Sequence, residues 1–90
     1  MTIARDIVVH GLVQGVFFRG TCMQVARSLE VAGWVRNEYD GTVRLHAEGS
    51  EDAVEALITW CREGPKHASV TKVDVTEAPV EGLTNFDVGW

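Results

Sequence analysis

One stretch decides the fold: Gly11-Leu12-Val13-Gln14-Gly15-Val16-Phe17-Phe18-Arg19. It joins a strand-like run at residues 7–9 to a helix-like run at residues 22–32. Glycines at 11, 15 and 20 allow backbone conformations that are closed to other residues, so backbone N–H groups can approach a bound group closely. The helix that follows adds unpaired N–H groups and the positive end of its dipole. The stretch therefore predicts a loop that binds an anion such as a phosphate.

Arg19 closes this loop with a planar guanidinium, which can hold two phosphoryl oxygens at once. Each charge-assisted hydrogen bond of this kind contributes about 1.5–3 kcal/mol. The loop is not a nucleotide-binding P-loop, because the G-x(4)-G-K-[ST] spacing and its lysine are missing. A plain glycine-rich connection is the alternative for a G-x(3)-G taken alone. The residues expected to bind phosphate are Gln14, Gly15, Val16, Phe17, Phe18 and Arg19.

The composition is that of one small globular domain. The chain has 90 residues, of which 46% are hydrophobic and 23% charged, enough for one modest core. Its net charge of −5 argues against a nucleic-acid partner, because surfaces that grip nucleic acid carry a basic excess. We expect a single domain over residues 1–90 that is a monomer and binds no nucleic acid.

The N-terminus, the cysteines and the histidines argue against a secreted protein, a membrane protein and a metal site. Residues 1–6 lack the apolar core of a signal peptide, and no apolar run approaches membrane-spanning length. We therefore expect a cytoplasmic protein with no membrane partner. Cys22 and Cys61 form neither a C-x-x-C pair nor a zinc set, and the three histidines do not cluster in the sequence. No metal site is expected.

Hydrophobic periodicity predicts an alternation of strands and helices. The expected strands lie at 4–10, 34–38, 42–48, 70–76 and 85–90, and the expected helices at 22–32 and, after an N-cap at Ser50, up to the Gly64-Pro65 stop. One sheet with two helices on one face buries both helical stripes economically. The prediction is an α+β fold: a ferredoxin-like βαββαβ sandwich with an antiparallel sheet and a short extra C-terminal strand.

The turn between the second and third strands can be deduced from parity. A three-residue turn at 39–41, with its glycine in the left-handed conformation, pairs Val35 with Leu45 and Asn37 with Val43. A two-residue turn would mix polar and apolar residues on one face. The longer turn aims Asn37 at the apolar face at the end of its strand, where a buried amide needs hydrogen-bond partners.

The topology places polar groups of the 11–19 loop beside Asn37. If the crossovers are right-handed, the first two strands run the same way, so the 11–19 loop and the end of the second strand share an edge of the sheet. Arg19 and Asn37 are therefore expected to meet.

Two blocks of the sequence resemble acylphosphatases. Residues 11–19 are similar to the G-x-V-Q-G-V-x-[FY]-R signature of that family, and GWVRN at 33–37 with DGTV at 40–43 is similar to its second block. The similarity runs to a short terminal strand at 86–88. It departs at 89–90, where a tyrosine is common in the family, and in the two cysteines.

The resemblance implies an acylphosphatase, an enzyme that hydrolyses the carboxyl-phosphate bond of small acyl phosphates to a carboxylate and inorganic phosphate. It implies that the loop amides and Arg19 hold the phosphate, that Asn37 orients the attacking water, and that no metal or cofactor takes part. The residues agree, because residues 11–19 hold no serine, cysteine or histidine. None is needed, since a carboxylate with a pKa of about 4 departs unprotonated. Phosphate or sulfate is expected to compete with the substrate.

Two other functions stay open. The first is a non-catalytic anion-sensing or RNA-binding module, which would want basic residues and aromatics on its open sheet face. The net charge of −5 argues against such a module. The second is a domain that binds carbamoyl-type phosphates inside a larger enzyme, as the similar domain of hydrogenase-maturation proteins does. A chain of 90 residues disfavours this.

Other conspicuous residues are assigned structural roles. We expect Arg36, Arg44 and Lys72 on solvated strand faces, His46 exposed, and Trp34 and Trp60 in packing or interfaces. Cys22 and Cys61 are expected to be two free buried thiols, with a disulfide that braces the loop as the alternative.

Overall fold

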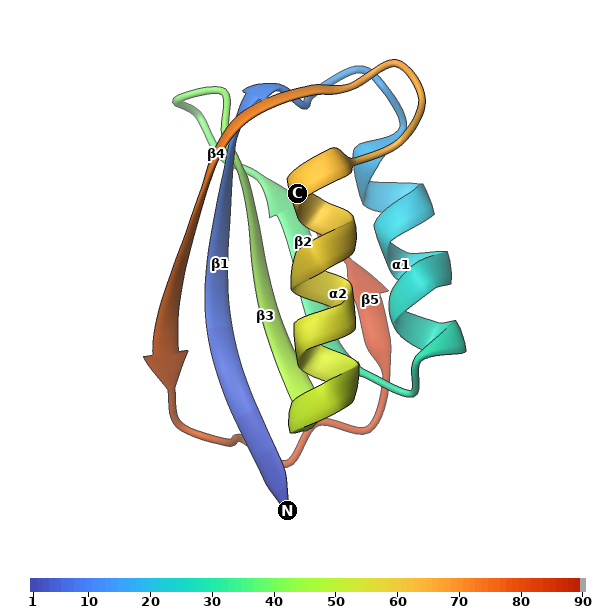
Figure 1. Ribbon diagram of the computed structural model, residues 1–90, viewed down its shortest axis with the longest axis vertical. Coiled ribbons are helices and arrows are strands. Elements are labelled where there is room, and N and C mark those ends of the chain that lie inside the picture. Colours follow the sequence, from blue (N-terminus) through green and yellow to red (C-terminus); the bar gives the residue numbers. More distant parts are fainter. Residues whose placement is uncertain (90) are drawn as a thin grey trace.

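The computed structural model describes residues 1–89, and Figure 1 shows a sheet with two helices in front of it. The elements are β1 (Thr2–Leu12), α1 (Phe18–Ser28), β2 (Ala32–Asn37), β3 (Val43–Ser50), α2 (Glu51–Glu63), β4 (Ser69–Ala78) and β5 (Phe86–Val88). The predicted βαββαβ order with an extra strand is confirmed. Trp90, which was predicted to continue the last strand, lies outside the described residues.

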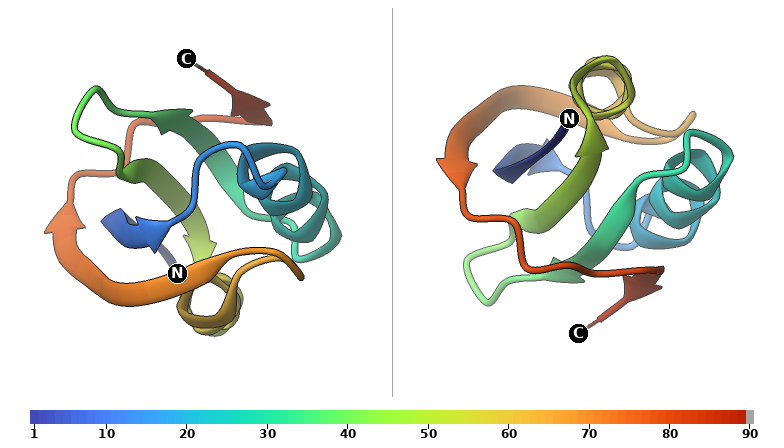
Figure 2. Two further views of the ribbon diagram at one scale, coloured as in Figure 1. Left: turned by 90° about the horizontal axis from the view of Figure 1, so that it is seen from above. Right: turned by 90° about the horizontal axis from the view of Figure 1, so that it is seen from below.

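The strands form one sheet in the order β4-β1-β3-β2-β5. The four long strands are antiparallel to their neighbours, as predicted, whereas β5 runs parallel to β2, so the sheet is mixed. The reason is the path of the chain. Residues 79–85 cross the face opposite the helices at the end of the sheet where β4 finishes (Figure 2, right), and β5 must then run back in the direction of β2.

The predicted register between β2 and β3 is confirmed. Val35 pairs with Leu45 and Asn37 with Val43, and Gly41 has a φ of 92° in the three-residue turn. Parity alone was sufficient here, because a shift by one residue would have moved every apolar side chain to the wrong face.

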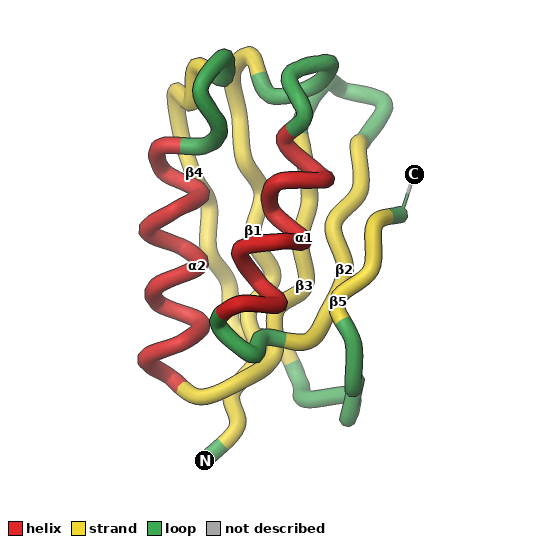
Figure 3. The backbone as a smooth tube through the Cα atoms, turned by 90° about the vertical axis from the view of Figure 1, so that its right-hand side faces the viewer, coloured by secondary structure: helices red, strands yellow, loops and turns green. Residues whose placement is uncertain are grey.

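Both helices cover one face of the sheet (Figure 3), α1 over β2 and β5 and α2 over β1, β3 and β4. The predicted stripe of α2 is confirmed, since its four residues are all buried: Val54, Leu57, Ile58 and Cys61. Ser50 is the predicted N-cap and accepts a 3.2 Å hydrogen bond from the Ala53 N–H. No helix within residues 1–89 is long and apolar enough to cross a membrane.

Helix α1 differs from the predicted range of 22–32. It begins earlier because Phe17 has a φ of 63° and turns the chain into the helix, which buries Phe18 as the first member of the stripe. It ends earlier because Glu30 has a φ of 59° and diverts the chain into β2. Neither residue is a glycine, so the usual sequence signals for these turns are absent. The consequence is that Arg19 lies on the first helical turn.

The two cysteines are free, fully buried thiols, as expected. They lie against each other, and burial together with the contact with Cys61 raises the pKa of Cys22 well above its ordinary value. A thiol of this kind is poorly reactive, because only the thiolate is a good nucleophile. The cysteines thus behave as small core residues.

His46 was expected to be exposed, and this is wrong: its exposed fraction is 2%. The Trp34 ring stacks on it with a centroid distance of 6.0 Å. Its Nδ1 lies 2.9 Å from Asp6 Oδ1, and its Nε2 lies 2.8 Å from Glu48 Oε2. A protonated imidazole can donate to both carboxylates at once.

Glu48 explains why a histidine is buried on the open face. Its carboxylate accepts hydrogen bonds from the N–H groups of Glu81 (2.6 Å), Gly82 (3.1 Å) and Leu83 (3.2 Å). These three donors belong to the segment that crosses from β4 to β5. The carboxylate therefore fastens the segment to the sheet, and His46 lies beneath the junction. Sequence alternation could not show this, because the covering residues are more than 30 positions away.

The His46–Glu48 pair should make stability depend on pH. Burial alone lowers the pKa of His46, but hydrogen bonds to Glu48 and Asp6 and the surrounding negative charge raise it above 6.5. Burial alone raises the pKa of Glu48, but His46 and the backbone N–H groups of the crossing segment lower it below 4.5. His46 therefore stabilises the fold fully below 6.5 and less as pH rises through its raised pKa. Glu48 stabilises it above 4.5 and less as pH falls through its lowered pKa.

We expect the free energy of unfolding to decline as pH rises above about 6.5, because the charged form of His46 is the one that the fold binds. His46→Gln should flatten this part of the profile, as measured by urea unfolding from about pH 5 to about pH 9. His67→Gln, at an exposed position, is the matched control. An equally steep decline in the His46 variant would contradict the assignment.

Candidate active site

The predicted anion loop lies between β1 and α1, and its second half has unpaired backbone donors in the described part of the chain. Gly15 and Phe17 both have positive φ, 74° and 63°. The first hydrogen bond of α1 runs from the Thr21 N–H to the Phe17 oxygen (3.2 Å). Within the described chain, the N–H groups of residues 15–19 donate to no protein acceptor. They form a set of donors around the positive end of a helix, which favours an anion.

Gly20 does not have the predicted role. It lies inside α1 in an ordinary helical conformation, with open space where a side chain would be. The left-handed position belongs to Phe17 instead, whose side chain is 84% exposed. A non-glycine residue in this conformation costs about 1–3 kcal/mol, and such strain concentrates at functional sites.

Arg19 projects from the first turn of α1 and is held from the far end of the chain. Its Nη1 donates a 2.8 Å hydrogen bond to the carbonyl oxygen of Gly89. This contact exists because β5 runs parallel to β2 and ends beside α1. One guanidinium N–H is used in this way, and the others remain to bind a ligand. Sequence reasoning placed Gly89 in the expected strand at 85–90 but did not predict its contact with Arg19.

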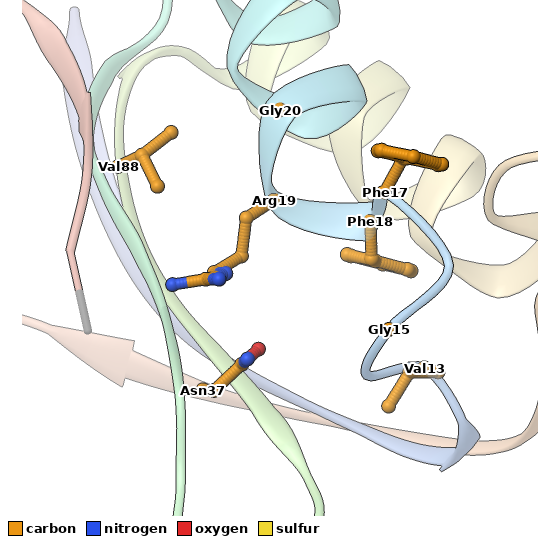
Figure 4. Close-up of a pocket in the computed structure, with 8 residues that line it drawn as sticks. All are labelled: Val13, Gly15, Phe17, Phe18, Arg19, Gly20, Asn37 and Val88. Atoms are coloured by element: carbon orange, nitrogen blue, oxygen red, sulfur yellow. The ribbon is translucent and has the colours of Figure 1, made fainter.

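Asn37 is the last residue of β2 and meets Arg19, as the topology predicted. In Figure 4 the Arg19 guanidinium and the Asn37 amide face the same space. Asn37 Oδ1 is buried and has no hydrogen-bond partner in the described part of the chain. A buried acceptor without a partner is costly, so a water or ligand donor is needed at this point.

These residues line two adjoining cavities. The first has a volume of about 300 Å³ and is lined by Val13, Gly15, Phe17, Phe18, Arg19, Gly20, Asn37 and Val88. The second has a volume of about 610 Å³ and is lined by Gln14, Arg19, Arg36, Asn37, Glu38 and Tyr39. Both contain Arg19 and Asn37, which therefore stand between them.

Gln14 was predicted to bind phosphate, but its side chain is already engaged. The Nε2 atom donates to the carbonyl oxygens of Glu38 (2.8 Å) and Thr42 (2.9 Å). The amide thus ties the anion loop to the turn between β2 and β3. A contribution to phosphate binding could come only from its backbone. Val16, another predicted contact, packs its side chain against the core.

The turn that Gln14 holds is built by Asp40. Its Oδ1 accepts from the N–H (3.0 Å) and the hydroxyl (2.6 Å) of Thr42. These bonds lower the pKa of Asp40. The DGTV block is therefore explained by turn structure, because an Asx turn followed by a left-handed glycine fixes the strand register that places Asn37.

The first cavity therefore combines three parts: a set of backbone donors, a guanidinium and an unpartnered amide oxygen. Backbone donors and a guanidinium bind phosphate oxygens, and an amide oxygen accepts a hydrogen bond from water. Among residues 1–89 no cluster of three or more His, Cys, Asp or Glu side chains is arranged as a metal site.

Comparison with known proteins identifies the family. The family model for acylphosphatase matches residues 5–88. The chain belongs to the acylphosphatase family. An acylphosphatase of Acidovorax sp. (strain JS42) is 49% identical over 86 residues, which cover 96% of this chain and 89% of the relative. The crystal structure of acylphosphatase from Bacillus subtilis matches with a TM-score of 0.95 and 36% identity over the full length of both chains. The predicted family and enzyme class are confirmed.

A larger protein contains a similar domain. Full-length HypF, in its phosphate- and nucleotide-bound form, matches with a TM-score of 0.89 and 27% identity, and the chain covers 12% of it. Sequence identity and the covered share of the matched protein are both higher for the acylphosphatases of Acidovorax sp. and Bacillus subtilis than for HypF.

Gln14→Leu should weaken the site without removing any ligand-binding atom. Loss of two hydrogen bonds to the turn is expected to lower the free energy of unfolding by about 1–2 kcal/mol. Since the turn would be less fixed, inorganic phosphate should also raise the unfolding midpoint less than in the original chain. Urea unfolding with and without phosphate measures both effects. Gln24→Leu, on the exposed side of α1, should change neither.

Proposed function

We propose that this chain hydrolyses small acyl phosphates, with the phosphoryl group in the first cavity and the attacking water at Asn37. One observation carries the proposal: unpaired loop N–H groups, Arg19 and a buried unpartnered amide oxygen converge on one cavity. Family membership supports the same activity.

The phosphoryl group is bound by the backbone donors of residues 15–19 and by Arg19. Phosphoryl transfer needs mainly positioning and stabilisation of charge on the equatorial oxygens. The backbone donors are fixed by the fold, and the Gly89 carbonyl fixes the guanidinium. The site therefore requires little rearrangement when the substrate binds.

The water is oriented by Asn37. A water that donates one hydrogen bond to Oδ1 satisfies the buried acceptor and leaves its own lone pair free for the phosphorus. Asn37 cannot take the proton, since an amide does not titrate. The leaving carboxylate departs unprotonated and needs no general acid. In a loose phosphoryl-transfer transition state the water gives up its proton late, to a phosphoryl oxygen or to solvent, so no general base, metal or cofactor is required.

The RNA-binding alternative fits the open face poorly. The cations predicted on solvated strand faces are each paired with a carboxylate: Arg36 with Glu38 (3.0 Å), Arg44 with Asp6 (3.7 Å) and Lys72 with Asp74 (3.5 Å). A face neutralised in this way gives little attraction for a phosphate backbone. The catalytic proposal also agrees with the expected cytoplasmic monomer of one domain. Sedimentation can test the monomeric state.

The direct test is hydrolysis of benzoyl phosphate in the presence of a chelator, with Arg19 variants alongside. Arg19→Ala should abolish both phosphate binding and turnover, because the guanidinium contacts the anion in the ground state and in the transition state. Arg19→Lys should rescue little, since an ammonium lacks the planar fork. A lysine variant that keeps more than about a tenth of the activity, which means a barrier raised by less than about 1.4 kcal/mol, would rule out this role.

Asn37→Ala should separate the two functions of the cavity. Turnover is expected to fall by about 100-fold or more, because the water loses its orientation, whereas inorganic phosphate should bind with nearly unchanged affinity. Steady-state kinetics and calorimetry measure the two quantities. If phosphate affinity falls together with activity, Asn37 belongs to the phosphate site instead.

A further inference from the structure

The second cavity has a position that the proposed chemistry does not yet use. It shares Arg19 and Asn37 with the phosphate cavity and is about twice as large, 610 Å³ against 300 Å³. A phosphoryl group held at Arg19 must send its acyl chain outward from the first cavity. The adjoining cavity lies next to that exit, so its lining is the surface that an acyl chain of a few carbons meets.

Arg36 is the cation of this lining besides Arg19. The other polar groups are less suited to bind a substrate: the Gln14 amide donates to two backbone carbonyls, and Tyr39 is fully exposed. Gly89 also connects the two arginines. Its carbonyl accepts from Arg19, and a Cβ at this position would lie 3.4 Å from Arg36 Cβ. The same backbone segment therefore holds the Arg19 guanidinium and passes beside the base of the Arg36 side chain.

The Arg36 side chain is held in place before any ligand binds. Its guanidinium lies 4.6 Å from the centre of the Trp34 ring, and its Nε donates a 3.0 Å hydrogen bond to Glu38 Oε1. An exposed arginine normally loses rotamer entropy when it binds, and stacking reduces that loss. Glu38 is the carboxylate partner of this guanidinium, but within residues 1–89 neither Nη atom donates a hydrogen bond. These two nitrogens are available to a ligand.

We propose that Arg36 is a specificity-determining residue that binds a carboxylate at the far end of the acyl chain. The preferred substrates are then acyl phosphates of dicarboxylic acids, with the phosphoryl group at Arg19 and the free carboxylate at Arg36. Glu38 takes only the Nε position and leaves the Nη edge, which suits a carboxylate. This inference rests on the proposed function, because it assigns the acyl side of the same site.

The test compares two substrates of equal chain length, succinyl phosphate and butyryl phosphate, which differ in a terminal carboxylate or methyl group. The original chain should have the higher kcat/KM for succinyl phosphate, by about fivefold for a half-exposed ion pair. Arg36→Gln should remove this preference through KM and leave butyryl phosphate unchanged within about twofold. Arg44→Gln, on the same sheet face but outside the cavity, should keep it.

Two readouts distinguish charge recognition from a structural role. The preference should shrink as salt is raised, because an exposed pair is screened, and Arg36→Lys should restore part of it. Equal kcat/KM for the two substrates in the original chain, or an equal loss on both in Arg36→Gln, would overturn the role of Arg36 while the proposed function stands. If the original chain hydrolyses neither substrate, the proposed function fails as well.

Discussion

The way α1 begins is the constraint on which the site depends. Phe17 takes a left-handed conformation, so the helix starts at Phe18, and among residues 1–89 its first N–H groups have no protein acceptor. The conformation has a cost, and core packing offsets it. Phe18 is 2% exposed, and its ring lies 5.1 Å from the Trp60 ring of α2. Full burial of such a side chain contributes about 1.5–3 kcal/mol, which is similar to the strain.

The second constraint is the order of the strands, which assembles the site from three separate parts of the chain. The loop after β1, the end of β2 and the segment after β5 meet at one edge because these three strands are mutually parallel. A right-handed crossover accounts for the first two. The third depends on the crossing segment 79–85, which carries the chain from one edge of the sheet to the other.

Sequence reasoning succeeded where local patterns determine the outcome. The stripe of α2, its Ser50 cap and the β2–β3 register follow from periodicity and turn length, and all agree with the structure. The meeting of Arg19 and Asn37 follows from the topology once these elements are known.

Two features that sequence reasoning missed have a common physical cause, since each depends on a contact between residues distant in the sequence. The burial of His46 needs the crossing segment, and the anchoring of Arg19 needs the Gly89 carbonyl, 70 residues away. Gln14 was expected in the phosphate site, and sequence reasoning did not predict what its side chain binds. Its true partners lie in a turn that is 24 and 28 residues away.

The structure separates its titrating groups from its proposed chemistry. His46 and Glu48 hold the crossing segment, the segment delivers β5 to β2, and the residue after β5 holds Arg19. The proposed reacting parts are backbone N–H groups, a guanidinium and an amide, none of which changes charge near neutral pH. A change of pH should therefore affect the activity mainly through the fold, by loosening the segment that supports Arg19. This arrangement is possible in an enzyme whose leaving group needs no proton, because its buried titrating groups, His46 and Glu48, then have no part in the reaction and only stabilise the fold.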